Sequence, residues 1–172
     1  MIVARLAFAL LTIGALIIPV SADGQLVGGV FWARAPDSFG GTNGFGAQAG
    51  VSLPLIPLEV FAAGTWFRPD CDGCDFKGWS VGAKLGIFSI PVLQPYVTAG
   101  RTWRDLEDPG AALMLDDDGF FTGAGLELRL PGFGLFGEGR YEFLTGEPDP
   151  SPDLRQWILR AGLVLRWGGV PL

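Results

Sequence analysis

The sequence predicts an all-β fold, an eight-stranded antiparallel up-and-down transmembrane β-barrel, from three observations. The chain has 172 residues, 49% of them hydrophobic and only 17% charged, which is a low charged fraction for a soluble domain. Beyond residue 22, no apolar run is long enough to form a membrane-spanning helix. Segments of about ten residues instead alternate large apolar side chains with small or polar ones, the period-two pattern of a β-strand.

Residues 1–22 have the features of a secretory signal peptide. Arg5 ends a short basic region, an apolar run covers Leu6–Val20, and Ser21 and Ala22 complete a small-residue cleavage site. The apolar run has about fifteen residues, whereas a bilayer-spanning helix needs roughly 20. We therefore expect cleavage after Ala22, rather than an uncleaved anchor, and one exported barrel domain over residues 23–172.

Eight segments carry the alternating pattern, and clusters of Gly, Pro and Asp separate them. The expected strands are 25–34, 44–53, 58–67, 77–88, 94–104, 119–130, 134–144 and 156–167. Short links follow the second, fourth and sixth strands. The other links are longer and acidic, and they cover 35–43, 68–76, 105–118 and 145–155. In an up-and-down barrel, this alternation puts the short turns at one end and the long loops at the other, as in outer-membrane barrels.

Strands in the first half of the chain each have one apolar face. The strand 25–34 contributes Trp32, and the strand 94–104 contributes Trp103. The apolar face of 44–53 consists of Phe45, Ala47, Ala49, Val51 and Leu53. That of 58–67 consists of Leu58, Val60, Ala62, Gly64 and Trp66. That of 77–88 consists of Trp79, Val81, Ala83, Leu85 and Ile87.

The last three strands repeat the division. The apolar face of 119–130 consists of Phe120, Thr122, Ala124, Leu126, Leu128 and Leu130. That of 134–144 includes Leu135, Tyr141 and Phe143. That of 156–167 consists of Trp157, Leu159, Ala161, Leu163, Leu165 and Trp167. Such a face suits contact with lipid.

The opposite faces carry charges that are nearly balanced in sign, and these form an expected lumen charge network. Its members are Glu59, Lys84, Glu127, Arg129, Glu138, Arg140, Glu142, Arg160 and Arg166. A soluble, lipocalin-like barrel is the alternative, with the apolar faces inside and the charges in water. Mutual pairing explains the balance better, because side chains fill the interior of an eight-stranded barrel and an unpaired charge there is costly.

Tryptophan provides a second argument for lipid contact. Five tryptophans fall at the long-loop ends of their strands and one at the opposite end, as in the aromatic girdles of membrane barrels. The expected girdle consists of Trp32, Trp66, Trp79, Trp103, Trp157 and Trp167. Placing Trp103 outward also places Arg101 outward, which snorkelling, a bulge or a shifted parity would resolve.

The last expected strand contains the pattern polar-x-Gly-x-x-apolar-x-aromatic, formed by Arg160, Gly162, Leu165 and Trp167. It resembles the terminal signal of small eight-stranded outer-membrane barrels of the OmpA transmembrane-domain, OmpX and OmpW type, and the architecture resembles theirs over the whole expected domain. The resemblance implies an outer-membrane location, surrounding outer-membrane lipid and recognition by the barrel-insertion machinery. Such proteins usually stop at the aromatic residue, whereas this sequence continues through residues 168–172.

Cys71 and Cys74 lie in the expected link 68–76, separated by an aspartate and a glycine. An exported protein meets oxidising conditions, so we expect a disulfide between them. A redox-active pair is an alternative that usually requires a helix N-terminus. A metal site is another, weakened by the single cysteine pair and the absence of histidine, and two thiols without a role are the last.

Acidic residues concentrate in the long links. Asp116, Asp117 and Asp118 are weak candidates there for a hard divalent cation such as Ca²⁺, which prefers carboxylate oxygens. Their spacing is not that of an EF-hand, and solvated loops that keep this end soluble are the simpler interpretation. We therefore assign no metal site.

The composition disfavours most enzymatic functions. Without histidine, the commonest general base and the Ser-His-Asp mechanism are absent, and no Ser/Asp constellation or cofactor motif replaces them. A net charge of -6 argues against a nucleic-acid partner. We expect a non-enzymatic outer-membrane barrel without a cofactor that has a structural or surface-interaction role. A narrow channel for ions or small solutes is the alternative, and a membrane-embedded lipid enzyme is a third class.

Overall fold

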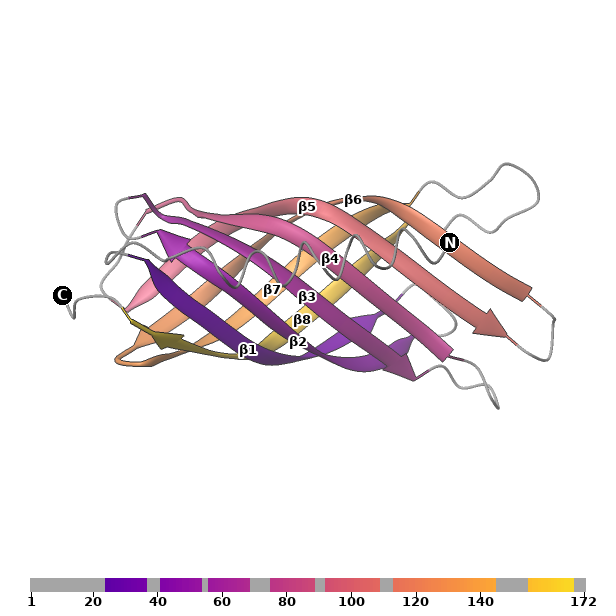
Figure 1. Ribbon diagram of the computed structural model, residues 1–172, viewed down its shortest axis with the longest axis horizontal. Helices are drawn as coiled ribbons and strands as arrows, with labels where there is room; N and C mark the ends of the chain where they lie inside the picture. The colour runs from indigo at the N-terminus through magenta and orange to yellow at the C-terminus, as the bar shows by residue number, and fades with distance from the viewer. Residues whose placement is uncertain are drawn as a thin grey trace.

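Eight antiparallel strands close into one barrel in the computed structural model (Figure 1). The structure describes residues 24–36, 41–53, 56–68, 75–88, 92–108, 113–144 and 155–168. The strands are β1 Gln25–Ala35, β2 Thr42–Leu53, β3 Leu58–Arg68, β4 Asp75–Gly86, β5 Leu93–Asp108, β6 Leu113–Leu130, β7 Phe133–Leu144 and β8 Gln156–Trp167. Each strand pairs with its neighbour in sequence, and β1 pairs with β8. The predicted eight-stranded antiparallel up-and-down barrel is confirmed.

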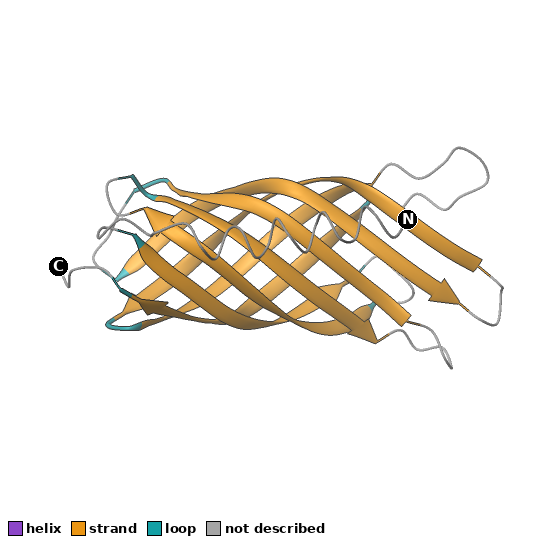
Figure 2. Ribbon diagram, viewed as in Figure 1, coloured by secondary structure: helices purple, strands orange, loops and turns teal. Residues whose placement is uncertain are grey.

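The links divide between the two ends of the barrel. Those that follow β2, β4 and β6 lie at the end that also carries the end of β8, which we call the short-turn end. The links after β1, β3, β5 and β7 lie at the opposite, long-loop end. Strands and short connections account for the described residues (Figure 2). None of these residues belongs to a helix long and apolar enough to cross a lipid bilayer.

One predicted link, 105–118, is wrong. β5 continues to Asp108 and β6 already begins at Leu113, with Asp105 opposite Asp116 in the register. Acidic side chains predict a loop, but a strand ladder is made by backbone N–H and C=O groups and continues where they pair. The β5–β6 hairpin therefore extends beyond the other strands at the long-loop end (Figure 1). The other predicted boundaries agree with the structure to about two residues.

Burial alternates along the strands and fixes which face is inside. Val81 is 39% exposed and Leu126 is 52% exposed, whereas Lys84, Glu127 and Arg160 on the opposite faces are at most 6% exposed. Apolar side chains therefore cover the outer wall and charged side chains lie within. The lipocalin-like alternative, which requires the reverse orientation, does not fit this structure.

Small inward residues make room for large ones. A Cβ atom at Gly125 would lie 2.5 Å from the ring of Tyr96, and one at Gly82 would lie 2.7 Å from the ring of Phe121. Both distances are too short for any side chain, so these rings lie directly against bare backbone. Glycine on the inner wall thus allows the narrow barrel to hold aromatic side chains as well as charges.

Candidate functional site

Side chains from all eight strands point into the barrel, and the charged ones form three successive clusters. We name these, from the short-turn end, the short-turn cluster, the central cluster and the upper cluster. Together they contain all nine residues of the charge network that the sequence suggested, and one more, Arg104.

The short-turn cluster is built from Glu59, Lys84, Glu127, Arg129 and Arg166. Lys84 Nζ donates to Glu59 Oε1 at 2.9 Å and lies 3.7 Å from Glu127 Oε2. Arg166 Nη2 lies 2.6 Å from Glu127 Oε1 and 3.4 Å from Glu59 Oε2. Arg129 Nε donates to Glu127 Oε1 at 3.3 Å, and its side chain remains 40% exposed. Two carboxylates are thus held between three cations that come from three different strands.

Glu138 is the centre of the next cluster. Its Oε1 accepts from Arg140 Nε at 2.9 Å and from Arg160 Nη1 at 3.2 Å, and its Oε2 accepts from the Tyr96 hydroxyl at 3.2 Å. Arg160 also donates to Gln48 Oε1 at 2.9 Å. Because one carboxylate faces two guanidinium groups, the central cluster carries a net positive charge.

The upper cluster pairs Arg104 with Glu142. Arg104 Nε donates to Glu142 Oε2 at 3.0 Å and Nη2 donates to Oε1 at 2.5 Å, which is a bidentate pair. Gln156 Nε2 donates to the same carboxylate at 3.4 Å. Sequence reasoning missed Arg104, although it shares the parity of Thr98 and Thr102, which also point inward.

Aromatic rings lie against the cations of these clusters. The guanidinium carbon of Arg160 is 3.7 Å from the centroid of the Phe31 ring, and that of Arg140 is 4.1 Å from the centroid of Phe121. Lys84 Nζ lies 4.8 Å from the centroid of Tyr96. Such cation–π contacts gain strength away from water. These rings are not among the lumen residues predicted from the sequence, although Phe121 has the same parity as Glu127.

The contacts run across the barrel and not only along its wall. Lys84 on β4 reaches Glu127 on β6, and Arg166 on β8 reaches Glu59 on β3. Arg140 on β7 donates to the Ser80 hydroxyl on β4 at 3.4 Å. These crossing side chains fill the lumen between opposite walls, as the narrow interior of an eight-stranded barrel requires.

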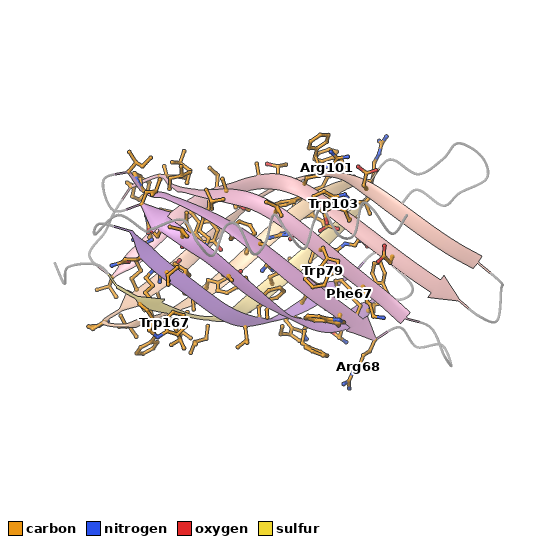
Figure 3. The ribbon with its side chains drawn as sticks, viewed as in Figure 1. Phe67, Arg68, Trp79, Arg101, Trp103 and Trp167 are labelled. Carbon is orange, nitrogen blue, oxygen red and sulfur yellow. The ribbon has the colours of Figure 1, made fainter. Side chains whose placement is uncertain are left out.

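The six tryptophans lie on the outer face, as the girdle interpretation requires. Trp32, Trp79, Trp157 and Trp167 are 45–53% exposed, while Trp66 and Trp103 are half-buried among outer-face neighbours. The ring of Trp66 lies 5.8 Å from Phe45 and 5.9 Å from Trp79, and that of Trp157 lies 5.3 Å from Tyr141. Aromatic side chains thus follow one another around the barrel near the long-loop end, with Trp167 at the other end (Figure 3).

Arg101 points outward without any break in the strand. The register of β5 is continuous with both neighbours, which excludes a bulge or a shifted parity among these residues. Arg101 Nε donates to Asp118 Oδ2 at 3.2 Å, and the guanidinium carbon lies 5.5 Å from the Trp103 ring centroid. Arg101 therefore forms an outward ion pair with Asp118, a contact that is not among the expectations from the sequence.

The insertion pattern lies in β8 with its residues on both faces. Arg160 points inward, whereas Leu165 and Trp167 are exposed on the outer face. Gly162 lies against Phe31, because a Cβ atom built on this glycine would be only 2.6 Å from the Cβ of Phe31. This geometry provides outer-face apolar groups at the end of the strand.

Other expected sites fall wholly or partly outside the described residues. The signal peptide over residues 1–22 and the pair Cys71 and Cys74 lie there, so cleavage and the disulfide stay predictions. The backbones of Asp116 and Asp117 belong to β6, but the structure does not describe their side chains. Within the described part of the chain, no group of three or more metal-ligating side chains occurs.

Comparisons with solved structures identify proteins with the same fold. The N-terminal β-barrel domain of Pseudomonas aeruginosa OprF superposes with a TM-score of 0.64 at 16% identity, covering 86% of this chain and all of that one. Neisserial surface protein A gives 0.59 at 19% identity, covering 84% of this chain and 97% of that one. The outer membrane protein OprG from Pseudomonas aeruginosa gives 0.57 at 13% identity, covering 86% and 97%.

No family model matches the sequence, and no curated protein matches it. The chain thus shares the architecture of small eight-stranded outer-membrane barrels without close sequence similarity to them.

Neutralising the centre of the central cluster should be far more damaging than neutralising an outer-face carboxylate. Glu138→Gln leaves Arg140 and Arg160 buried without a counter-charge, so we expect the free energy of unfolding to fall by about 3–5 kcal/mol. Asp118→Asn is the matched control, because its exposed pair with Arg101 should contribute at most about 1 kcal/mol. Urea unfolding of the refolded barrel measures both, and equal losses would contradict the buried network.

Proposed function

We propose that this protein is an integral outer-membrane barrel that has a structural or surface-interaction role in the cell envelope. The observation that carries the proposal is the division of the wall into two faces. Exposed apolar side chains cover the outside of the barrel. Six cationic side chains and four carboxylates point into the lumen. Only a surrounding apolar solvent makes such an outer face favourable, because in water it would drive aggregation.

Closure of the sheet supports the same location. Backbone N–H and C=O groups have no water to bond in hydrocarbon, so a membrane sheet must be closed. Here β1 pairs with β8 over nine residue pairs, from Leu26 opposite Trp167 to Arg34 opposite Leu159. Aromatic side chains near both ends of the outer face fit the two membrane–water boundaries.

The lumen supports a non-conducting role. Its charged side chains are paired across the interior, which favours a closed plug over a wide path for solutes. The acidic residues of the long-loop end would then supply the surface for interactions, and the barrel would supply their anchor in the envelope. Barrel-insertion machinery and outer-membrane lipid are the partners this proposal requires.

Quenching by brominated lipids tests the membrane location. In vesicles of phosphatidylcholine, bromines near the headgroups should quench the tryptophan fluorescence of the refolded chain more strongly than bromines near the acyl-chain ends. The reason is that the outer-face tryptophans lie near the ends of the barrel. A chain that remains unquenched by both lipids would contradict the proposal.

Conductance in planar bilayers separates the plugged barrel from the channel. The unmodified protein should give no steady current, whereas E138A/R140A/R160A, which removes the central cluster, should give small steady currents. R101A is the matched control, since its side chain lies outside the barrel, and it should remain silent. Steady, ion-selective currents from the unmodified protein would replace the plugged-barrel proposal with the channel.

A further inference from the structure

The lysines and arginines of the barrel are distributed unequally over its surface. From residue 24 onward, six point into the lumen, and the other five lie outside it at the long-loop end. These five are Arg34, Arg68, Lys77, Arg101 and Arg155. On the described outer face near the short turns, charged side chains are absent.

Two of these arginines lie in one row of the sheet. Arg34 on β1 is opposite Asn43 on β2, and Asn43 is opposite Arg68 on β3. All three side chains are exposed, and Arg68 projects from the barrel wall (Figure 3). Neither arginine forms an ion pair within the described residues. The arginines are two strands apart, or about 10 Å at the backbone, so their long side chains can both reach one group placed over Asn43.

An aromatic row and an apolar hollow lie directly beside this polar row. Trp32, Phe45 and Trp66 occupy the next outward positions on the same three strands, two residue pairs closer to the middle of the barrel. A hollow in the outer wall follows, where the small side chains of Ala47 and Ala161 lie between larger neighbours. Its lining is almost entirely apolar and includes Val30, Trp32, Phe45, Trp66, Leu135 and Leu163.

We propose that this part of the wall binds one phosphate-bearing lipid. Arg34, Asn43 and Arg68 hold the phosphate, and the hollow around Ala47 and Ala161 receives an acyl chain. Guanidinium groups form strong charge-assisted hydrogen bonds to phosphate, and the amide of Asn43 adds a neutral donor between them. The order of the rows, from cationic to aromatic to apolar, matches that of a lipid from headgroup to chain. The site rests on the proposed function, because it requires this wall to face a bilayer.

Native mass spectrometry of the refolded full chain in a neutral detergent tests the headgroup contact. The probe is dioleoyl phosphatidic acid, and dioleoylglycerol is the same lipid without phosphate. We expect one phosphatidic acid to bind at least about tenfold more tightly than dioleoylglycerol. R34Q/R68Q should lose this preference, and R34K/R68K should keep most of it. Addition of inorganic phosphate should not displace the lipid, which distinguishes a lipid site from a site for the free anion.

Two controls isolate the row and the hollow. R101Q removes an outer-face arginine that is already paired with Asp118, so it should bind phosphatidic acid like the unmodified chain. A161F fills the hollow without a change in charge and should weaken binding about fivefold, whereas A124F, on the outer face of β6, should not.

Several results would overturn the site. For the headgroup contact, they are phosphatidic acid binding that R34Q/R68Q leaves unchanged, a loss of binding in R101Q as large as in R34Q/R68Q, or dioleoylglycerol binding as tight as that of phosphatidic acid. Displacement of the lipid by inorganic phosphate would also overturn it. For the hollow, the contradicting result is that A161F and A124F weaken binding equally. Brominated-lipid quenching of the same preparations keeps the two proposals distinct. Loss of the site with normal quenching refutes only the lipid site, whereas absence of quenching in the unmodified chain refutes the membrane location on which the site depends.

Discussion

Carboxylates inside a closed sheet need cationic partners, because the narrow interior offers them little water and an isolated buried charge is costly. Glu127, Glu138 and Glu142 are each at most 6% exposed, and each contacts at least one arginine. The pairs connect walls that are distant in sequence, so they also hold the barrel in one register. A one-residue slip of any strand would turn its charged face outward and its apolar face inward. Charge pairing inside and apolar contact outside therefore enforce the same arrangement.

Rings and glycines complete this interior. Arg140 and Arg160 are bound by one shared carboxylate, which cannot balance two positive charges, and the rings of Phe121 and Phe31 provide further stabilisation of each guanidinium group. Those rings fit because glycine lies beside them on nearby strands, as Gly82 does for Phe121. The lumen thus combines ion pairs with aromatic packing, and its small residues are as necessary as its charged ones.

The period of two predicted most of the fold, since a residue such as Lys84 or Leu126 reveals its face by parity alone. The same rule could have placed Arg104 and Phe121 inside, but alternation does not say which inward residues meet across the barrel. Those contacts depend on register and strand tilt, which no local pattern contains. The link predicted over 105–118, around Asp116, is wrong for another reason. Its acidic composition describes side chains, whereas the β5–β6 hairpin is extended by backbone pairing. The outward pair of Arg101 and Asp118 likewise became visible only with the register.

The orientation of the wall is most directly measured with nitroxide labels placed singly along β4 in the vesicle-inserted chain, with Cys71 and Cys74 replaced by serine. Labels at Trp79, Val81 and Ala83 should collide frequently with oxygen dissolved in the bilayer, and labels at the inward positions Phe76 and Ser80 should be protected from it. Accessibility that alternates in this phase is the result the structure predicts. Alternation in the opposite phase, or uniform access along the strand, would contradict a barrel with its apolar face in lipid and its charges inside.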